Sequence, residues 1–275
     1  MPAETSQPVL RFERVCVSFE GVPALEDVSF QAFEGESRVI MGATGSGKTV
    51  LMKTALGLQH PDSGTVYVFG RDTSRMRERE LFEIRSRIGM LFQESALFDS
   101  LTIEENVSYP LLNQPSIQCP RDQVRPRVEE ALKFVALEGT LAKFPSELSG
   151  GMRRRAAIAR AVVTQPPLLL YDSPTAGLDP ITAQTIMALV VKERDLNKST
   201  TLIVTYRYQD GNLVANFRYN PENGRLEPAG DHGGSSRPRT IFMVLREGRL
   251  VFEGAQPELE AAQDPYVAKF VKHRG

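Results

Sequence analysis

Residues 42–49 read Gly42-Ala43-Thr44-Gly45-Ser46-Gly47-Lys48-Thr49, which fits the pattern G-x-x-x-x-G-K-[ST]. An apolar run at residues 37–41 precedes the glycines, and residues 48–58 carry apolar side chains at helical spacing. The sequence therefore predicts a strand, a glycine loop and a helix, in which loop N–H groups and the helix N-terminus favour a bound phosphate. We expect Lys48 to reach the β- and γ-phosphates and Thr49 to bind Mg²⁺. The alternative is a glycine-rich turn that only caps a helix.

A second strand supplies the acidic residue that such a loop requires. The run Leu168-Leu169-Leu170-Tyr171-Asp172 is short and apolar and ends in a carboxylate. At the tip of a buried strand, Asp172 is suited to hold the metal ion through water. A carboxylate that merely ends a strand in a turn is the alternative, and the phosphate loop upstream favours the metal role.

The charge balance restricts the partners. The chain has 275 residues, with 33 Lys plus Arg against 34 Asp plus Glu and a net charge of −1, so we expect no nucleic-acid binding by bulk electrostatics. No run approaches about 18 consecutive apolar residues, so a membrane role requires a partner. The start lacks a cationic segment followed by an apolar one, and Cys16 and Cys119 are isolated. We therefore predict a cytosolic protein.

Strands and helices alternate on both sides of a helical stretch. Strands are predicted at residues 9–19, 24–32, 37–41, 65–69, 88–92, 168–171 and 200–204. Helices are predicted at residues 48–58, 75–87, 152–163 and 181–196. Residues 94–164 lack strand signals. This order predicts an α/β nucleotide-binding core with an inserted helical subdomain.

The C-terminal third is less regular. Residues 207–239 hold five Gly, three Pro and four Asn, which predicts a hairpin from residues 213–219 and 225–226, followed by a flexible stretch at residues 230–238. A second hairpin is predicted over residues 241–253, and one or two short helices over residues 257–271.

Further motifs identify a family. The run Leu148-Ser149-Gly150-Gly151-Met152, the residue Gln93 and the run Ala176-Gly177-Leu178-Asp179 follow the phosphate loop in an order that resembles an ATP-binding-cassette (ABC) ATPase. The resemblance implies a P-loop NTPase of the α/β class with an antiparallel β subdomain. It implies one domain over residues 1–275, with a core at 1–93 and 165–254, a helical subdomain at 94–164, an atypical polar insertion at 207–239 and a tail at 255–275.

The resemblance also implies the ligands and roles of the site. In this family two subunits enclose two ATP molecules, so Ser149, Gly150 and Gly151 are expected to contact the γ-phosphate held by the opposite subunit. Phe19 matches the aromatic residue that stacks on adenine, although it is also suited to a strand core. The implied nucleotide ligands are Phe19, Gly42, Ala43, Thr44, Gly45, Ser46, Gly47, Lys48, Thr49, Val50, Ser149, Gly150, Gly151 and Asp179. The implied Mg²⁺ ligands are Thr49, Gln93 and Asp172, and the implied catalytic positions are Gln93, Ser173 and Tyr206.

Within the family, several stretches are similar to the ATPases of MCE-associated lipid transporters of the Mla type. These stretches are residues 90–99, residues 105–111, the run Arg153-Arg154-Arg155 and the run Asp264-Pro265-Tyr266-Val267. The three arginines are equally consistent with a solvated helix face. The resemblance implies an MlaE-like membrane permease and an MCE-domain substrate-binding protein as partners, with Gln93 through Tyr109 receiving a permease helix at the inner face of the membrane.

Two positions depart from the family pattern. The residue after the metal-binding Asp is usually a Glu that polarises the attacking water, and here it is Ser173. A His usually follows the next strand, and here Tyr206 stands in its place. A hydroxyl is a poor base near neutral pH, and tyrosine brings no positive charge. We therefore predict that nucleotide binding survives while hydrolysis loses orders of magnitude in rate.

Three interpretations reconcile these features. The chain hydrolyses ATP slowly with a substitute such as Gln93, Glu94 or Arg207, or it pairs with a different ATPase whose site it completes, or it binds ATP as a regulatory subunit without turnover. The dimer is accordingly a homodimer or a heterodimer. Two further alternatives are a soluble cassette protein outside transport and a purely structural nucleotide-binding module. We also hypothesise that the hairpin and flexible stretch of residues 207–239 replace the helix that usually follows the position of Tyr206.

Overall fold

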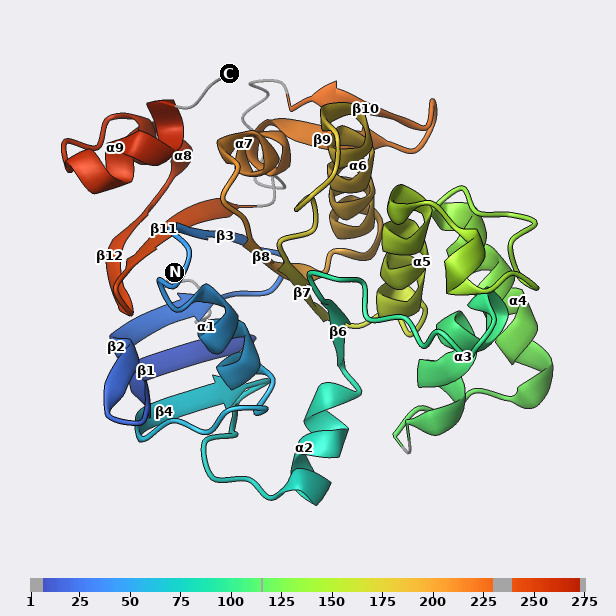
Figure 1. Ribbon diagram of the computed structural model, residues 1–275, viewed down its shortest axis with the longest axis horizontal. Helices are drawn as coiled ribbons and strands as arrows, with labels where there is room; N and C mark the ends of the chain where they lie inside the picture. Colours follow the sequence, from blue (N-terminus) through green and yellow to red (C-terminus); the bar gives the residue numbers. More distant parts are fainter. Residues whose placement is uncertain (1–6, 115, 230–238, 273–275) are drawn as a thin grey trace, which may run out of the picture.

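The computed structural model describes residues 7–114, 116–229 and 239–272. Within these ranges a six-stranded sheet forms the centre, in the order β12-β11-β3-β8-β7-β6 (Figure 1). Neighbouring strands from β11 to β6 are parallel, and β12 is antiparallel to β11. The strands are β3 (Ser37–Gly42), β6 (Ile88–Leu91), β7 (Leu168–Asp172), β8 (Thr200–Val204), β11 (Thr240–Arg246) and β12 (Arg249–Gly254).

A second, antiparallel sheet packs beside the first. Its order is β2-β1-β4-β5, and its strands are β1 (Leu10–Phe19), β2 (Val22–Ala32), β4 (Ser63–Val68) and β5 (Arg71–Asp72). One hydrophobic cluster joins its inner face to the central sheet and to helix α1 (Lys48–Ala55). The glycine loop thus lies between a buried parallel strand and a helix that the core holds in place.

Helices cover the other face of the central sheet. A second cluster joins α3 (Ile103–Asn113), α4 (Arg121–Phe134), α5 (Gly150–Val162) and α6 (Pro180–Asn197) to strands β7 and β8. The short helix η1 (Pro145–Glu147) precedes α5, and α2 (Glu78–Arg85) leads into β6. A third cluster packs α7 (Tyr208–Asn216), α8 (Gln256–Glu260) and α9 (Pro265–Lys272) against β3 and β11.

Most expected elements are confirmed within a few residues. The strands predicted at residues 9–19, 24–32, 37–41, 65–69, 88–92, 168–171 and 200–204 are β1, β2, β3, β4, β6, β7 and β8. The second hairpin is the pair β11 and β12, and the two tail helices are α8 and α9. The predicted flexible stretch at residues 230–238 lies outside the described residues.

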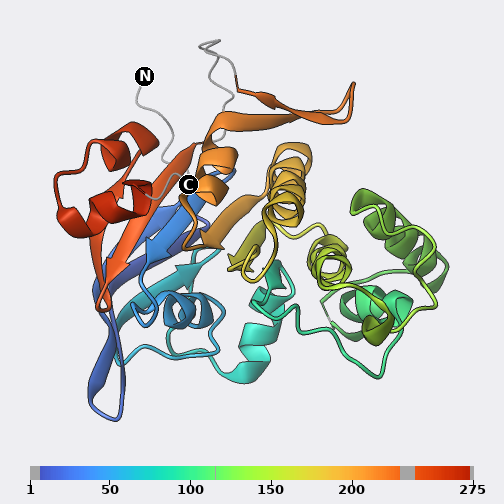
Figure 2. The same cartoon turned by 45° about the horizontal axis from the view of Figure 1, so that its top comes forward.

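The prediction for residues 213–219 is wrong in part. Helix α7 continues to Asn216, and the hairpin strands are β9 (Phe217–Asn220) and β10 (Arg225–Pro228) beside α6 (Figure 2). A helix therefore does follow Tyr206, contrary to the hypothesis that the hairpin replaces it. Gly211 explains the error, because a Cβ there would stand 2.5 Å from Phe242. The glycine permits close packing of α7 on β11 and does not mark a loop.

Candidate functional site

The glycine loop has a backbone that only glycine adopts readily at two positions. Gly45 has a φ of 78° and Gly47 a φ of 101°, both in the left-handed region. A Cβ on Gly47 would also lie 2.4 Å from the carbonyl oxygen of Ala24. The loop therefore folds tightly against the β1–β2 hairpin, and α1 begins directly after it at Lys48.

Lys48 turns back into this loop. Its Nζ donates hydrogen bonds to the carbonyl oxygens of Gly42 at 2.9 Å and Ala43 at 2.7 Å, and to Ser46 Oγ at 3.3 Å. Burial lowers the pKa of Lys48, and the nearby charge of Asp172 acts in the opposite direction. A partly desolvated ammonium group at a helix N-terminus is suited to pair with a phosphate group, since it has lost much of its hydration.

The carboxylate of Asp172 accepts hydrogen bonds from the hydroxyls of Thr49 and Ser173. Thr49 Oγ1 donates to Asp172 Oδ2 at 3.4 Å, and Ser173 Oγ donates to Asp172 Oδ1 at 3.2 Å. Asp172 is buried, with 5% of the residue exposed. Burial raises its pKa, whereas the hydrogen bonds from Ser173 and Thr49 lower it. Strands β3, β8 and β7 are neighbours in the parallel part of the sheet, which brings Asp172 to the end of the loop that follows β3.

These oxygens fit a magnesium ion. Among the described residues, no group of three or more His, Cys, Asp or Glu side chains is arranged as a metal site. Magnesium does not require one, because it keeps several waters and is usually held by one or two carboxylates together with substrate phosphates. A buried carboxylate beside a threonine hydroxyl is such an oxygen set.

The two departures from the family pattern lie at the same edge of the sheet. Ser173 follows β7 with a φ of 50°, and its N–H donates to the carbonyl oxygen of Val204 at 2.9 Å. Tyr206 follows β8 and is 56% exposed. Because Asp172 pairs with Val204 in the sheet register, Ser173 and Tyr206 leave neighbouring strands at matching ends.

A second group of predicted residues gathers at the starts of α5 and α6. Ser149 is the N-cap of α5, where its hydroxyl accepts from Met152 N at 3.3 Å. Asp179 is the N-cap of α6 and accepts from Ile181 N at 3.1 Å and Thr182 N at 3.0 Å. Hydrogen bonding from the side chain of Thr182, together with these backbone bonds, lowers the pKa of Asp179. A hollow of about 520 Å³ is lined in part by Ser149, Gly150, Gly151, Gly177 and Asp179. This group is thus a surface of its own, distinct from the contacts of Lys48 and Asp172.

Three further predicted residues, Phe19, Val50 and Gln93, lie on three different elements. Phe19 ends β1 and is 48% exposed, so it is not a core residue of the strand. Val50 lies in α1 and packs against the core that α1 shares with the sheets. Gln93 follows β6 and lines a hollow of about 340 Å³ with Gly150, Arg154 and Ala176.

Arg154 is a functional candidate that sequence reasoning left undecided. It is 6% exposed, so it is not part of a solvated face. Its guanidinium donates to the carbonyl oxygens of Phe92 at 3.0 Å, Gln93, and Ala176 at 3.4 Å. Arg154 therefore ties α5 to the loops that follow β6 and β7.

Asp210 is a residue that sequence reasoning missed. It is buried in α7, and its Oδ2 accepts hydrogen bonds from Thr175 Oγ1 and Thr205 Oγ1, each at 2.6 Å. Burial raises the pKa of Asp210, and the two threonine hydroxyls lower it. The carboxylate links the loop after β7 to the loop after β8. The signal that the sequence offers is an acidic residue four positions after Tyr206, which is one helical turn.

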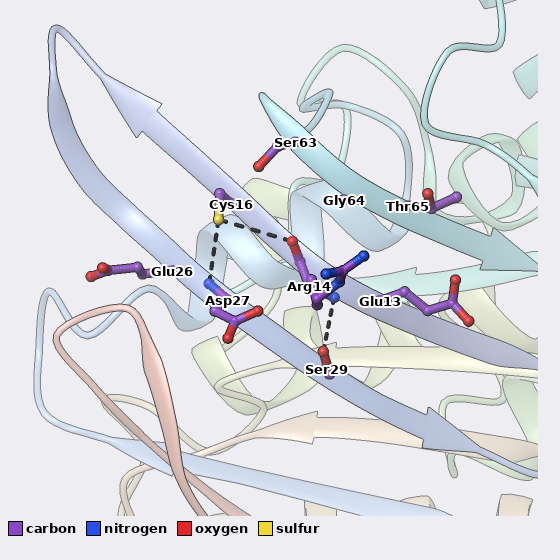
Figure 3. Close-up of a pocket in the computed structure, with 9 residues that line it drawn as sticks. All are labelled: Glu13, Arg14, Cys16, Glu26, Asp27, Ser29, Ser63, Gly64 and Thr65. Atoms are coloured by element: carbon purple, nitrogen blue, oxygen red, sulfur yellow. Dashed lines mark hydrogen bonds between the residues drawn. The ribbon is translucent and has the colours of Figure 1, made fainter.

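Another hollow lies elsewhere, on the antiparallel sheet. It has a volume of about 760 Å³ and is lined by residues of β1, β2 and β4 that include Arg14, Cys16 and Asp27 (Figure 3). Arg14 and Asp27 have φ values of 47° and 51°, at irregularities in the pairing of β1 with β2. The hollow therefore follows from local distortion of the sheet, and none of the predicted nucleotide residues lines it.

The fold and the glycine loop define a P-loop nucleotide-binding domain. Comparison with known families identifies it more closely, because the model described as "ABC transporter" matches residues 25–176. The chain belongs to the ABC transporter family and is an ATP-binding subunit of it. In the described part of the chain, every helix is too short or too polar to cross a bilayer.

Individual relatives support this assignment. The chain is 32% identical over 247 residues to the "Intermembrane phospholipid transport system ATP-binding protein MlaF" of Haemophilus influenzae. This match covers 90% of this chain and 84% of the relative. It is 38% identical over 257 residues to the "Probable ribonucleotide transport ATP-binding protein mkl" of Mycobacterium leprae. This second match covers 94% of this chain and 67% of the relative.

A solved structure agrees with the fold. The dimer of the ATP-binding cassette MJ0796 in a post-hydrolysis state, bound to ADP and phosphate, matches with a TM-score of 0.74 and 29% identity. The match covers 90% of this chain and 98% of that chain. ABC ATPases dimerise and work with membrane permeases, and the fold binds ATP.

Proposed function

We propose that this chain binds MgATP with the residues around its glycine loop and energises lipid transport with a membrane permease, while its own site hydrolyses ATP poorly. The observation that carries the proposal is the group formed by Lys48, Thr49, Asp172 and Ser173. This group contains a half-buried ammonium, a threonine hydroxyl and a buried carboxylate, and a serine stands where the family usually has a glutamate.

Binding follows from the loop and helix α1. The N–H groups of the glycine loop other than that of Ala43, together with the ammonium of Lys48, hold the β- and γ-phosphates, because the amides and the helix dipole favour negative charge. Thr49 and Asp172 hold Mg²⁺, with Gln93 as a further ligand, and the ion neutralises charge on the phosphate oxygens. Phe19, exposed at the end of β1, stacks on the adenine.

Dimerisation completes the site. The first N–H groups of α5 lack partners within the helix, as in every α-helix. Gly150 and Gly151 present these groups on the hollow beside Ser149 and Asp179. In a dimer of the family type, this surface meets the γ-phosphate bound by the other subunit, which is either a second copy or a different ATPase.

Hydrolysis is the step that the two departures affect. Ser173 already donates its hydroxyl hydrogen to Asp172 and offers no base to the attacking water. Tyr206 carries no positive charge to offset the charge that develops on the phosphoryl group. Slow turnover with Gln93, Glu94 or Arg207 in a substitute role, completion of a partner's site, and regulatory binding remain the three modes to compare.

The cargo is proposed from the relatives and the motifs together. The name of the Haemophilus influenzae relative refers to intermembrane phospholipid transport. Residues 90–99 and 105–111 resemble the same type of ATPase. Exposed Phe98 and Tyr109, whose rings lie 4.8 Å apart, provide an apolar surface for a helix of an MlaE-like permease at the cytoplasmic face of the membrane. An MCE-domain protein would then supply the lipid.

A second candidate cargo has its own support. The mycobacterial relative is named for ribonucleotide transport and is more identical to this chain, although the chain covers 67% of its length. A structural ABC subunit and a soluble cassette protein outside transport are further alternatives that come from the altered site alone.

The experiment measures ATP binding and ATP turnover by the purified chain, first alone and then reconstituted with its permease and MCE-domain protein in phospholipid vesicles. We expect micromolar ATP binding that Lys48→Ala abolishes, and turnover that is slow alone and rises in the complex with phospholipid but not with ribonucleotides. Rapid turnover by the chain alone contradicts the impaired site, and stimulation by ribonucleotides selects the second cargo.

A further inference from the structure

The C-terminal helix α9 reaches the glycine loop through one side chain. The hydroxyl of Tyr266 accepts a hydrogen bond from the N–H of Ala43 at 3.1 Å and donates one to the carbonyl oxygen of Leu245 at 3.0 Å. A phenolic hydroxyl has one hydrogen to donate and lone pairs to accept, so both bonds form at once. Residues 223 positions apart in the chain are joined directly at the first turn of the loop.

The position of this contact is significant. Strand β11 pairs with β3 up to the partners Leu245 and Gly42, and the paired region ends there. Tyr266 bridges the next step, between the last paired carbonyl and the first amide of the loop. It therefore helps to fix the direction in which the loop leaves β3.

Ala43 connects this contact to the phosphate-binding lysine. Its N–H is held by Tyr266, and its carbonyl oxygen accepts from Lys48 Nζ at 2.7 Å. One residue, Ala43, thus connects the Tyr266 hydroxyl of the C-terminal helix to the ammonium group of Lys48. A shift of this residue moves an acceptor of Lys48.

The ring of Tyr266 is itself held in place. Asp264 accepts the N–H groups of Tyr266 and Val267 at 2.7 and 3.2 Å, which caps α9. The ring of Phe270 packs edge-on at 5.4 Å between centroids, and Lys269 Nζ lies 3.8 Å from the Tyr266 ring centroid. Val267 is buried in the cluster that packs the tail on β3 and β11. The hydroxyl is therefore presented by an anchored helix.

We propose that Tyr266 is a positioning residue of the nucleotide site, through which α9 presets the glycine loop for phosphate binding. The inference rests on the proposed function of that loop. By thermodynamic linkage, a partner that displaces α9 changes ATP affinity, and ATP changes the affinity for that partner by the same factor. The tail is thus a second point, besides the permease surface, at which the nucleotide site is controlled.

The test compares two tyrosine-to-phenylalanine variants of the full chain. Tyr266→Phe removes only the hydroxyl that touches the loop. Tyr208→Phe is the matched control, because its hydroxyl accepts from Gln256 Nε2 at 2.6 Å and so ties the tail to α7 without touching the loop. For each variant we would measure the ATP dissociation constant by competition with a fluorescent analogue, the thermal midpoint without nucleotide, and amide hydrogen exchange of the peptide that covers residues 42–47.

We expect Tyr266→Phe to weaken ATP binding about three- to tenfold and to speed exchange at residues 42–47, with both properties unchanged in Tyr208→Phe. Equal losses of affinity in the two variants would mean that general loosening of the tail is responsible, and this overturns the positioning role. Unchanged affinity and exchange in Tyr266→Phe overturn it as well. If the wild-type chain binds no ATP, the proposed function fails, and the exchange measurement still decides whether Tyr266 orders the loop.

Discussion

Arg154→Met provides a direct test of the way the loops around the site are held together. The guanidinium is buried and donates to carbonyl oxygens of two separate loops, one after β6 at Phe92 and Gln93 and one after β7 at Ala176. Methionine fills much of the same volume, so the change removes hydrogen bonds without leaving a large cavity. The carbonyl oxygens then lose their charged donor.

The size of the effect follows from these contacts. A hydrogen bond from a charged group contributes about 1.5 to 3 kcal/mol, and the bonds to Phe92 and Gln93 are the two strong ones. At the lower end of this range the two lost bonds amount to about 3 kcal/mol, of which relief from burying the charge returns about 1 kcal/mol. Burial also lowers the pKa of Arg154, which agrees with a real cost of burying the cation. The net loss is about 2 kcal/mol.

The assay is urea denaturation of the wild type, Arg154→Met and Arg153→Met. Arg153 is the control, because it is exposed on the same helix and donates to the carbonyl oxygen of Leu148 alone. We expect its replacement to cost less than about 1 kcal/mol. Equal midpoints for both variants, or no loss for Arg154→Met, would refute the view that Arg154 ties the two loops and would favour a solvated helix face.

Two other perturbations test the glycine loop and the buried contacts of Asp210 with Thr175 and Thr205. Gly47→Ala should weaken ATP binding at least tenfold, since its φ is 101° and the new Cβ lies 2.4 Å from the carbonyl oxygen of Ala24. Gly139→Ala, which has a positive φ of 82° and nothing within 4 Å of the new Cβ, is the control in the same fluorescence assay. For Asp210, burial raises the folded-state pKa above the unfolded value of about 3.9, so the folded state binds its proton more tightly and stability falls as pH rises through that window. Urea unfolding at several pH values should therefore show the wild type gaining stability relative to Asp210→Asn on acidification, and the opposite trend contradicts the assignment.

The fold was predictable where a pattern is local. The loop at residues 42–49, the apolar strand before it and the run that ends at Asp172 each carry their signal within about ten residues. The helix at Tyr208–Asn216 shows where such signals mislead, because its glycine was interpreted as a sign of a loop. What stabilises that helix is packing of Gly211 against Phe242, which no local pattern records.

The residues of the site likewise fall into those that a local motif identifies and those whose role depends on long-range contacts. Lys48, Thr49 and Asp172 were identified from motifs, and the structure brings them together. Asp210 and Tyr266 act through partners that the fold supplies, with a tyrosine on the last helix reaching the loop near the start of the chain. A single sequence contains no sign of such long-range contacts, since a tyrosine after Asp-Pro is compatible with many roles.

Ser173 and Tyr206 provide the last prediction, which concerns two parts that act together. Their strands pair at Asp172 and Val204, and Ser173 N–H donates to the carbonyl oxygen of Val204, so the two residues follow neighbouring strands at the same edge of the sheet. A restored glutamate orients water, and a restored histidine stabilises charge on the phosphate. Because both effects operate on one transition state, their contributions should not be additive.

We therefore expect Ser173→Glu and Tyr206→His each to raise ATP turnover by less than about tenfold, and the double variant to exceed the product of the two. Backbone strain is the same in the wild type and in Ser173→Glu, since serine and glutamate both have a Cβ and residue 173 has a φ of 50° in either case. Lys48→Ala in the double variant is the control and should abolish the gain. A double variant that is no faster than the better single variant would mean that another feature, such as the geometry of the dimer, limits hydrolysis.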